Sequence, residues 1–142
     1  MWRCGMTESM YETGLSATVL AFHVMPGLPA PEGELHSHDY RLDVVVRRVG
    51  LDDAQMVVDL DLLGRGLGEL TAAIEGRNLD EIVAPAMGVD AVTVEVFARW
   101  AHDRLSAVLG TLPDASMSVR VWETALAFGG YEGPVRSRSS SS

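Results

Sequence analysis

The sequence predicts an α+β domain: an antiparallel sheet of four strands with two helices on one face. Two observations lead to this fold class. Segments rich in β-branched residues lie towards both ends of the chain, and two segments with helical spacing lie between them, in the order β-β-α-α-β-β. That order is typical of an antiparallel sheet that carries its helices on one side. The length of 142 residues fits one domain with one hydrophobic core.

The first two strands are predicted at residues 15–24 and 40–49, because both segments are rich in apolar and β-branched side chains. A stretch with three prolines and two glycines separates them and is predicted to be a loop. Residues 1–11 are expected to be a flexible leader and the serine-rich residues 135–142 a disordered tail, which leaves 12–134 as the single domain.

The first helix is predicted after the apolar stretch MVVDL, since Leu62, Leu67, Leu70 and Ile74 can share one helix face. Three glycines in this segment lower its helix propensity. Residues 76–91 contain glycine and proline and are predicted to be a connector without a helix.

Residues 92–109 form the clearest predicted helix, with apolar side chains recurring at helical spacing. The third strand is expected at residues 118–123, where Val119 and Val121 would point inward and their neighbours outward. A glycine-containing turn would then lead into a short last strand.

The charge of the chain limits its partners. The formal net charge is −9, and all eleven basic residues are arginines. This balance disfavours nucleic acid and anionic membranes as partners, because contacts to phosphate groups supply most of the affinity for them. It also disfavours a triphosphate substrate, unless several arginines gather in one pocket. The sequence has no apolar run of about 18 residues and no apolar signal-peptide stretch at its start, so we expect a cytoplasmic protein.

Three of the four histidines, His23, His36 and His38, are candidate metal ligands. Residues two apart on a strand point to the same side, so His36 and His38 would present imidazoles about 6–7 Å apart on one face. His23 ends the preceding strand, and the loop could bring it alongside. Three imidazoles with an open fourth position are typical of a catalytic zinc site. The competing interpretation is that these are surface histidines near a loop.

Other polar residues allow two interpretations. Glu123 lies on a strand with apolar neighbours, where its carboxylate is either exposed or held in a pocket to accept two N–H donors. Thr93 and Glu95 begin the long helix and could be a cap and a first-turn acid, and Asp59 could cap the first helix. His102 lies in the middle of the long helix, on what we expect to be a solvated face.

Six segments resemble, in order, the motifs of the 6-pyruvoyl-tetrahydropterin synthase and 6-carboxy-tetrahydropterin synthase (QueD-like) family. ELHSHDYRLDVVV resembles the LHGHxY segment, and AFHVM resembles the first zinc-ligand strand. MVVDLDLL resembles MVxDFxxLK, and IEGRNLDEI resembles LDHxNLN. VTVEVFARW resembles PTxENxAxxI, and VWETALAFGGY resembles VxVxETxxxxxxY. The resemblance covers roughly residues 15–132.

The resemblance implies a T-fold, in which subunits pair their sheets into a barrel with the helices outside. It implies a homo-oligomer, commonly a hexamer of two stacked trimers, with sites at subunit interfaces. It also assigns roles. The three histidines would bind Zn²⁺, Glu123 would anchor the guanidine-like edge of a pterin ring, Thr93 would lie near that pocket, and Glu95 would support it.

The departures from the family pattern concern the residues that move protons. Glu32 stands where the family usually has a catalytic cysteine, and Glu75 and Gly76 stand where it has an Asp-His pair. Ser37 replaces the glycine between the paired histidines, and Val96 replaces the asparagine after Glu95. The resemblance therefore retains the metal ligands and the ring anchor but not the usual acid/base groups.

Glu32 is the best candidate for the proton acceptor, since it replaces the cysteine near the metal. A carboxylate is a weak base at its ordinary pKa of about 4.3, so it would need burial to act near neutral pH. Glu34 is a second candidate in the same loop, and Glu75 could orient the base or share its proton.

These residues favour a zinc-dependent enzyme that acts on a pterin or related ring compound by proton transfer with elimination or carbon–carbon cleavage. Some family members with glutamate in place of the cysteine cleave the side chain of dihydroneopterin. One alternative is a repurposed zinc-dependent lyase, cyclase or dehydratase that acts on a non-pterin substrate in a specialised pathway. Another is a non-catalytic protein that binds a pterin or purine-like ligand.

Overall fold

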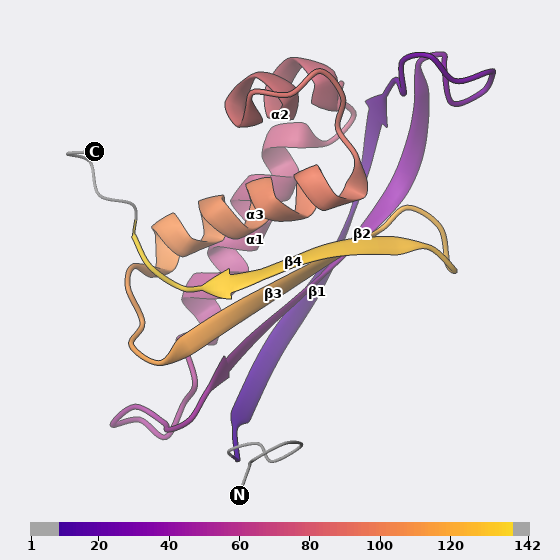
Figure 1. Cartoon of the computed structure of the whole chain (residues 1–142). Coiled ribbons are helices and arrows are strands. Elements are labelled where there is room, and N and C mark those ends of the chain that lie inside the picture. Colours follow the sequence, from indigo (N-terminus) through magenta and orange to yellow (C-terminus); the bar gives the residue numbers. More distant parts are fainter. Residues whose placement is uncertain (1–8, 138–142) are drawn as a thin grey trace, which may run out of the picture.

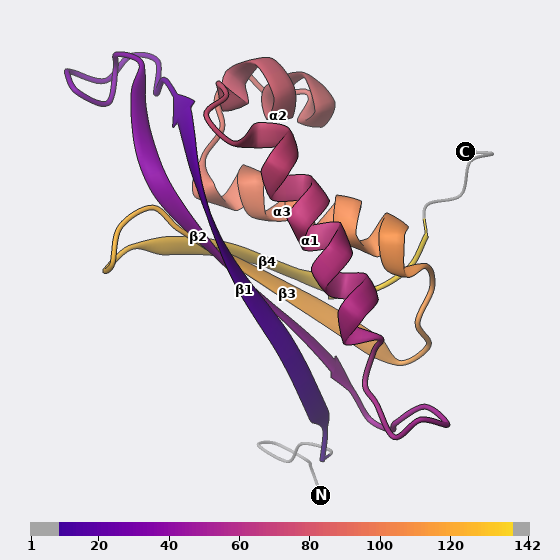
Figure 2. The ribbon, with the colours of Figure 1, turned by 180° about the vertical axis from the view of Figure 1, so that it is seen from behind.

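The computed structural model describes residues 9–137, and Figure 1 shows their arrangement. Seven elements follow one another along the chain: β1 (Tyr11–His23), β2 (His36–Arg48), α1 (Leu60–Ile74), α2 (Leu79–Met87), α3 (Val94–Leu109), β3 (Ala115–Trp122) and β4 (Phe128–Pro134). The strands form one antiparallel sheet in the order β1-β2-β3-β4. All three helices lie on the same face of this twisted sheet, as the opposite views of Figures 1 and 2 show.

The predicted fold class is confirmed, but the expected connector contains a third helix. α2 begins after Asn78, whose side chain accepts a hydrogen bond from the Asp80 N–H, and ends at Gly88 in the left-handed conformation. Leu79 and Val83, one turn apart, are fully buried. The sequence interpretation missed this helix because it took the glycines and the proline of the segment as loop signals.

The core lies between the sheet and the helices. Alternate residues of β2 and β3 point towards the helices, so that Leu42 pairs with Val121 and Val44 pairs with Val119 in register, all with no exposed surface. The inward orientation predicted for Val119 and Val121 is therefore confirmed. The partner residues on the other face remain exposed or partly buried, as is typical of an antiparallel sheet with one covered face.

Both hairpin strands begin earlier than the sequence indicated. β1 starts at Tyr11, and β2 starts at His36, so the paired histidines lie on the strand itself. Val135 is 1% exposed and packs into the core just after the last strand. The predicted leader and tail fall largely on residues 1–8 and 138–142, which lie outside the described residues, and those domain boundaries stay predictions.

The crossing of α1 and α3 explains one of the glycines in α1. A side chain at Gly66 would meet Leu105 and Val108 of α3 at about van der Waals contact or closer, with its Cβ 3.3 Å and 3.2 Å from their side chains. Glycine therefore lets the two helices approach. Asp59 caps α1 by accepting from the backbone N–H groups of the first turn, as the capping interpretation predicted.

The prediction for His102 was wrong: its side chain is buried, with 4% exposed. Its ring packs edge-on against Tyr131 of β4 at 4.9 Å between ring centres, and its Nε2 lies 3.2 Å from the Gly133 carbonyl oxygen. α3 therefore has a buried polar position where its neighbours suggested a solvated one. The last strand was predicted, but the helix pattern around His102 does not indicate that this strand covers it.

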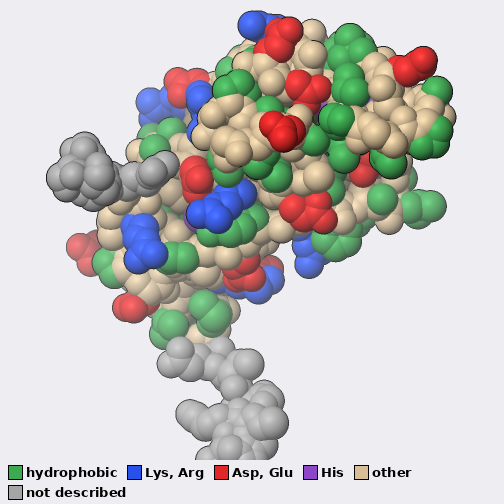
Figure 3. All heavy atoms as spheres, turned by 45° about the horizontal axis from the view of Figure 1, so that its top comes forward, with side chains coloured by type: hydrophobic (Ala, Val, Ile, Leu, Met, Phe, Trp, Pro, Cys, Tyr) green, Lys and Arg blue, Asp and Glu red, His purple; other side chains and the backbone are tan. Residues whose placement is uncertain are grey.

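No helix among the described residues is both long and apolar enough to cross a membrane. The face shown in Figure 3 carries acidic and basic side chains interspersed with hydrophobic ones, and histidine side chains are almost hidden there. Of the four histidines, His23 and His102 are buried, and His36 and His38 are partly buried.

Candidate metal centre

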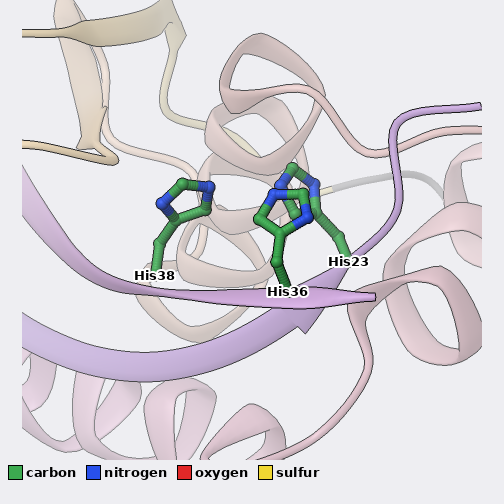
Figure 4. Close-up of side chains that lie close together, drawn as sticks. All are labelled: His23, His36 and His38. Carbon is green, nitrogen blue, oxygen red and sulfur yellow. The ribbon is translucent and has the colours of Figure 1, made fainter. Parts of the chain in front are cut away.

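Three histidines converge at the loop end of the β1–β2 hairpin. His23 is the last residue of β1 and pairs directly with His36, the first residue of β2, while His38 follows on the same face. Ring centres lie 4.5 Å apart for His23 and His36, 5.3 Å for His23 and His38, and 4.9 Å for His36 and His38. Figure 4 shows the three side chains rising from the two strands towards the same space. One nitrogen of each ring lies within 4.8 Å of the others.

Backbone carbonyls fix the orientation of two of these rings. The Nδ1 of His23 lies 2.9 Å from the Val92 carbonyl oxygen, and the Nδ1 of His36 lies 2.8 Å from that of Glu34. A carbonyl only accepts, so each Nδ1 carries the proton and donates it, which leaves the lone pair on Nε2. Such contacts are the usual outer support of metal-binding histidines.

The Nε2 atoms of His23 and His36 are both buried and have no hydrogen-bond partner among the described residues. Buried polar atoms are normally paired, so two adjacent unpaired acceptors indicate a missing partner. A cation that prefers neutral nitrogen ligands, such as Zn²⁺, would satisfy both, and His38 would supply a third nitrogen. The donor set therefore fits the zinc that the sequence predicted.

The loop between β1 and β2 reverses the chain, so that His36 and His38 lie beside His23. The N–H of Met25 donates to the Glu32 carbonyl at 2.8 Å, and a turn at residues 29–34 is closed by the Gly33 and Glu34 N–H groups. These bonds let β2 return in register with β1, and His23 faces His36 for that reason. Strand pairing alone thus places two of the three candidate ligands, His23 and His36, opposite each other.

Glu123 directly follows β3 and lies beside His38, with its Oε2 3.5 Å from the His38 Nε2. Burial lowers the pKa of His38, and the neighbouring His23 and His36 rings lower it further, although Glu123 and Glu32 act in the opposite direction. The net result is an imidazole that stays neutral to lower pH than usual. Neutral imidazole is the form that binds a metal.

Tyr40 forms the floor of the cluster and was not singled out from the sequence. Its side chain is 1% exposed, and its ring centre lies 5.3 Å from that of His38 and 6.2 Å from that of His23. Burial raises the pKa of its hydroxyl strongly, and the carboxylates of Glu123 and Asp80 raise it further. The hydroxyl therefore stays protonated and can donate a hydrogen bond. Its position two residues after His38 was a signal that could have identified it.

The two loop glutamates differ in how they reach the site. Glu34 contributes its backbone carbonyl, which holds the His36 ring. The carboxylate of Glu32 is among the charges that raise the pKa of His38, which places it within electrostatic reach of the cluster. Both residues are exposed in this chain, so the burial that a carboxylate base requires is not supplied by the chain alone.

The predicted ring-pocket residues at the start of α3 have structural contacts. The Thr93 hydroxyl accepts a hydrogen bond from the Val96 N–H at 3.1 Å and so caps α3. The residue before it, Val92, supplies the carbonyl that holds His23, and nothing in its apolar side chain could have revealed this. Glu95 is an exposed first-turn acid that packs over Gly129 of β4.

Glu75 lies at the end of α1, where its Oε1 accepts a hydrogen bond from the Leu20 N–H at 3.4 Å. Glu75 therefore lies along the edge of β1, and its carboxylate is hydrogen-bonded to the backbone of that strand. The following Gly76 has φ of +70° and no side chain to offer. Within one chain, the Glu75 carboxylate thus supports the strand that ends in His23.

The family model described as 6-pyruvoyl tetrahydropterin synthase matches residues 16–134 of this sequence. The chain belongs to the 6-pyruvoyl tetrahydropterin synthase family. The match includes β1 from residue 16 onwards, all of β2, all three helices and Glu123, so the family assignment covers the whole candidate site. A search of curated protein sequences finds no match.

Solved structures agree with the fold. The chain is similar to 6-pyruvoyl tetrahydropterin synthase from Caenorhabditis elegans, at 21% identity and a TM-score of 0.71, over 94% of this chain and 99% of that one. It is similar to a catalytic-residue variant of the Plasmodium vivax synthase, in which alanine replaces glutamate, at 12% identity and a TM-score of 0.70, over 89% and 99% of the two chains. An uncharacterized protein from Wolinella succinogenes matches at 14% identity and a TM-score of 0.65, over 87% and 98%. At sequence identities this low, the structural similarity shows that these chains share the T-fold.

Proposed function

We propose that this family member is a zinc-dependent lyase of the cytoplasm that acts on a pterin or a related ring compound. The observation that carries the proposal is the pair of buried, unpartnered Nε2 atoms on His23 and His36, with His38 beside them. Three neutral imidazoles bind Zn²⁺ and leave a fourth position for water or substrate. A purely structural site would be expected to close that position with a fourth side chain.

When bound, zinc supplies a Lewis acid that polarises a substrate oxygen and makes a neighbouring C–H or O–H group more acidic. The chain's own residues then have three tasks. His23, His36 and His38 bind the metal, and Glu123 accepts hydrogen bonds from the guanidine-like edge of the ring. Tyr40 closes the floor of the site with its aromatic ring and keeps its proton.

Proton transfer is assigned to Glu32, with elimination or carbon–carbon cleavage as the outcome. Its support is its electrostatic reach to His38 and the Plasmodium vivax relative, in which a glutamate is named as a catalytic residue. Its carboxylate is exposed in one chain, so we propose that a second copy covers it in a homo-oligomer. The outer edge of β1 before Leu20 and the outer edge of β4 pair with no strand of the described chain, which suits such an assembly.

A non-pterin ring compound is the second candidate substrate. The observation in its favour is Gly76, which leaves no imidazole at the position where the family resemblance places a histidine. Zinc and Glu123 would be reused in that case, with different chemistry on the substrate side chain. Glu75, next to Gly76, would then be the acidic group that orients the base.

The first test asks whether Glu123 holds the ring. Zinc-loaded wild-type protein and Glu123→Gln would be titrated with a pterin, with zinc content measured in parallel. We expect about a 10-fold or greater loss of pterin affinity with zinc retained, because an amide oxygen replaces a charged acceptor that receives two N–H donors. Equal pterin affinity in both proteins would reject the anchor role. If the wild type binds zinc but no pterin, the non-pterin candidate takes precedence.

The second test asks which loop carboxylate accepts the proton. Glu32→Gln and Glu34→Gln would be compared in turnover of the candidate substrate, at matched zinc occupancy. Loss of a general base typically lowers turnover by about 10²–10⁴-fold, so we expect this loss for Glu32→Gln. Glu34→Gln should change turnover little, since Glu34 supports His36 through its backbone. The reverse pattern would move the base to Glu34, and full turnover in both variants would remove the loop from the chemistry.

A further inference from the structure

The segment between α1 and α2 lies along the outer edge of β1, next to the metal centre. The Gly76 N–H donates to the Leu20 carbonyl at 2.7 Å, and the Phe22 N–H donates to the Arg77 carbonyl at 2.9 Å. Asn78 forms a parallel bridge with Phe22. The last residues of β1, which carry the first histidine, are therefore held from both sides: by β2 on one edge and by this segment on the other.

Asp80 extends this contact by one further step. Its Oδ2 accepts a hydrogen bond at 2.9 Å from the N–H of Val24, the residue directly after His23. Its own N–H donates to the side chain of Asn78, which caps α2. The carboxylate is thus fixed by the first turn of α2, and it in turn fixes the backbone where β1 ends. A carboxylate that accepts from a backbone N–H makes a strong, well-oriented hydrogen bond.

The other oxygen of Asp80, Oδ1, is buried and accepts no hydrogen bond from the described residues. A buried carboxylate oxygen without a partner costs free energy unless a positive charge is near. A cation held by three neutral imidazoles would offset the charge that Asp80 carries.

We propose that Asp80 is a positioning residue of the metal centre: it holds the backbone next to His23 and places a negative charge close to that end of β1. Two kinds of support then converge on His23. The Val92 carbonyl orients its ring, and Asp80 fixes the backbone position from which the ring projects. The inference rests on the proposed function, since it takes the histidines as zinc ligands. It adds a residue on α2, an element that contributes no ligand.

The experiment measures zinc affinity in four proteins by competition with a chromogenic chelator: wild type, Asp80→Ala, Asp80→Asn and Glu81→Gln. Asp80→Ala removes both the charge and the acceptor of the Val24 N–H. Asp80→Asn removes the charge but keeps an oxygen that can accept that bond. Glu81→Gln is the matched control, because Glu81 is an exposed acid in the same first turn of α2 and changes the net charge and helix-end electrostatics equally.

We expect Asp80→Ala to weaken zinc binding by about 10–100-fold, the usual cost of losing an outer-shell partner, while Glu81→Gln binds zinc as tightly as the wild type. The absorption spectrum of the Co²⁺-loaded protein should also shift in Asp80→Ala and not in Glu81→Gln, because the ligand geometry changes. A loss in Asp80→Asn as large as in Asp80→Ala assigns the effect to charge, and a smaller one assigns it to the hydrogen bond.

Zinc affinities of both Asp80 variants within about 2-fold of the wild type would overturn the proposal. Circular dichroism and thermal unfolding of the zinc-free proteins show whether each variant folds, and Asp80→Asn keeps the test valid if Asp80→Ala does not. Failure of the proposed function gives a different result, since wild type and Glu81→Gln would then bind no zinc either.

Discussion

His23 and His102 are two buried histidines with the same local pattern and different surroundings. Each has 4% of its surface exposed, one ring nitrogen at a backbone carbonyl, and the other nitrogen buried without a partner among the described residues. Around His23, two more imidazoles lie within 5.3 Å between ring centres. Around His102, the neighbours are the Tyr131 ring and the Asp103 carboxylate, whose oxygen lies 3.7 Å from its Nδ1. The pattern within one residue therefore does not distinguish a ligand from a packing histidine.

His23 and His102 differ in how many possible metal ligands lie close to them. At the hairpin end, strand register places His23 opposite His36 and pleating adds His38, so one nitrogen of each ring lies within 4.8 Å of the others. On α3, the side chains of Arg99, Asp103 and Ser106 line one pocket with His102, and the Ser106 hydroxyl is buried without a partner among the described residues. One imidazole beside a hydroxyl and a single carboxylate lacks the three-ligand set of a zinc site. His102 is better explained as part of the contact between α3 and β4.

The largest expected effect separates the two histidines by metal binding. His23→Ala should remove high-affinity zinc, because two remaining imidazoles cannot complete a site of three protein ligands. His102→Ala should bind zinc in the same amount as the wild type. Metal content after dialysis against a weak chelator, measured by elemental analysis, decides between them.

Equal zinc loss in both variants would contradict the comparison and indicate that zinc content reports overall folding. Retention of zinc by His23→Ala would instead remove the hairpin end as the metal centre. To separate these outcomes, both variants would be checked by circular dichroism in the absence of metal before loading.

The sequence was informative where a local pattern and the family motifs agreed. The spacing of two correctly put His36 and His38 on one face, and Asp59 and Thr93 cap helices as their residue types suggest. His23, 13 residues before the pair, was a candidate because it ends the first strand, and the family resemblance then assigned it as a ligand. Loop length alone does not determine where a chain returns.

Contacts made by the backbone or across tertiary layers could not be read from the sequence. The carbonyl of Val92 orients His23, although its side chain is apolar and its position in the sequence is remote. Asp80 fell in a segment interpreted as a connector, because the signals of Gly76 and Pro85 outweighed its helical pattern. His102 has charged neighbours along the helix and is buried by β4, a strand that begins 26 residues later.

The second and smaller effect concerns stability at His102. Replacing it by alanine leaves a cavity against Tyr131 and removes the partner of the Gly133 carbonyl, so we expect a loss of about 2–4 kcal/mol in the free energy of unfolding. His38→Ala, at a ligand that is only partly buried, should cost the zinc-free protein less. Urea unfolding of zinc-free protein, at one fixed protein concentration because assembly contributes to stability, measures both.

The effect of zinc on the stability of the two variants separates the roles of His102 and His38. If His102 stabilises the fold and His38 serves the metal, zinc should increase the stability of the His102→Ala protein as much as it increases that of the wild type, and should not stabilise His38→Ala. Ligand binding to the native state alone raises the free energy of unfolding in proportion to the logarithm of ligand concentration over its dissociation constant. A His102→Ala protein that gains nothing from zinc would show that the start of α3, next to Val92, is coupled to its middle, which packs on β4. The two histidines would then belong to one cooperative unit.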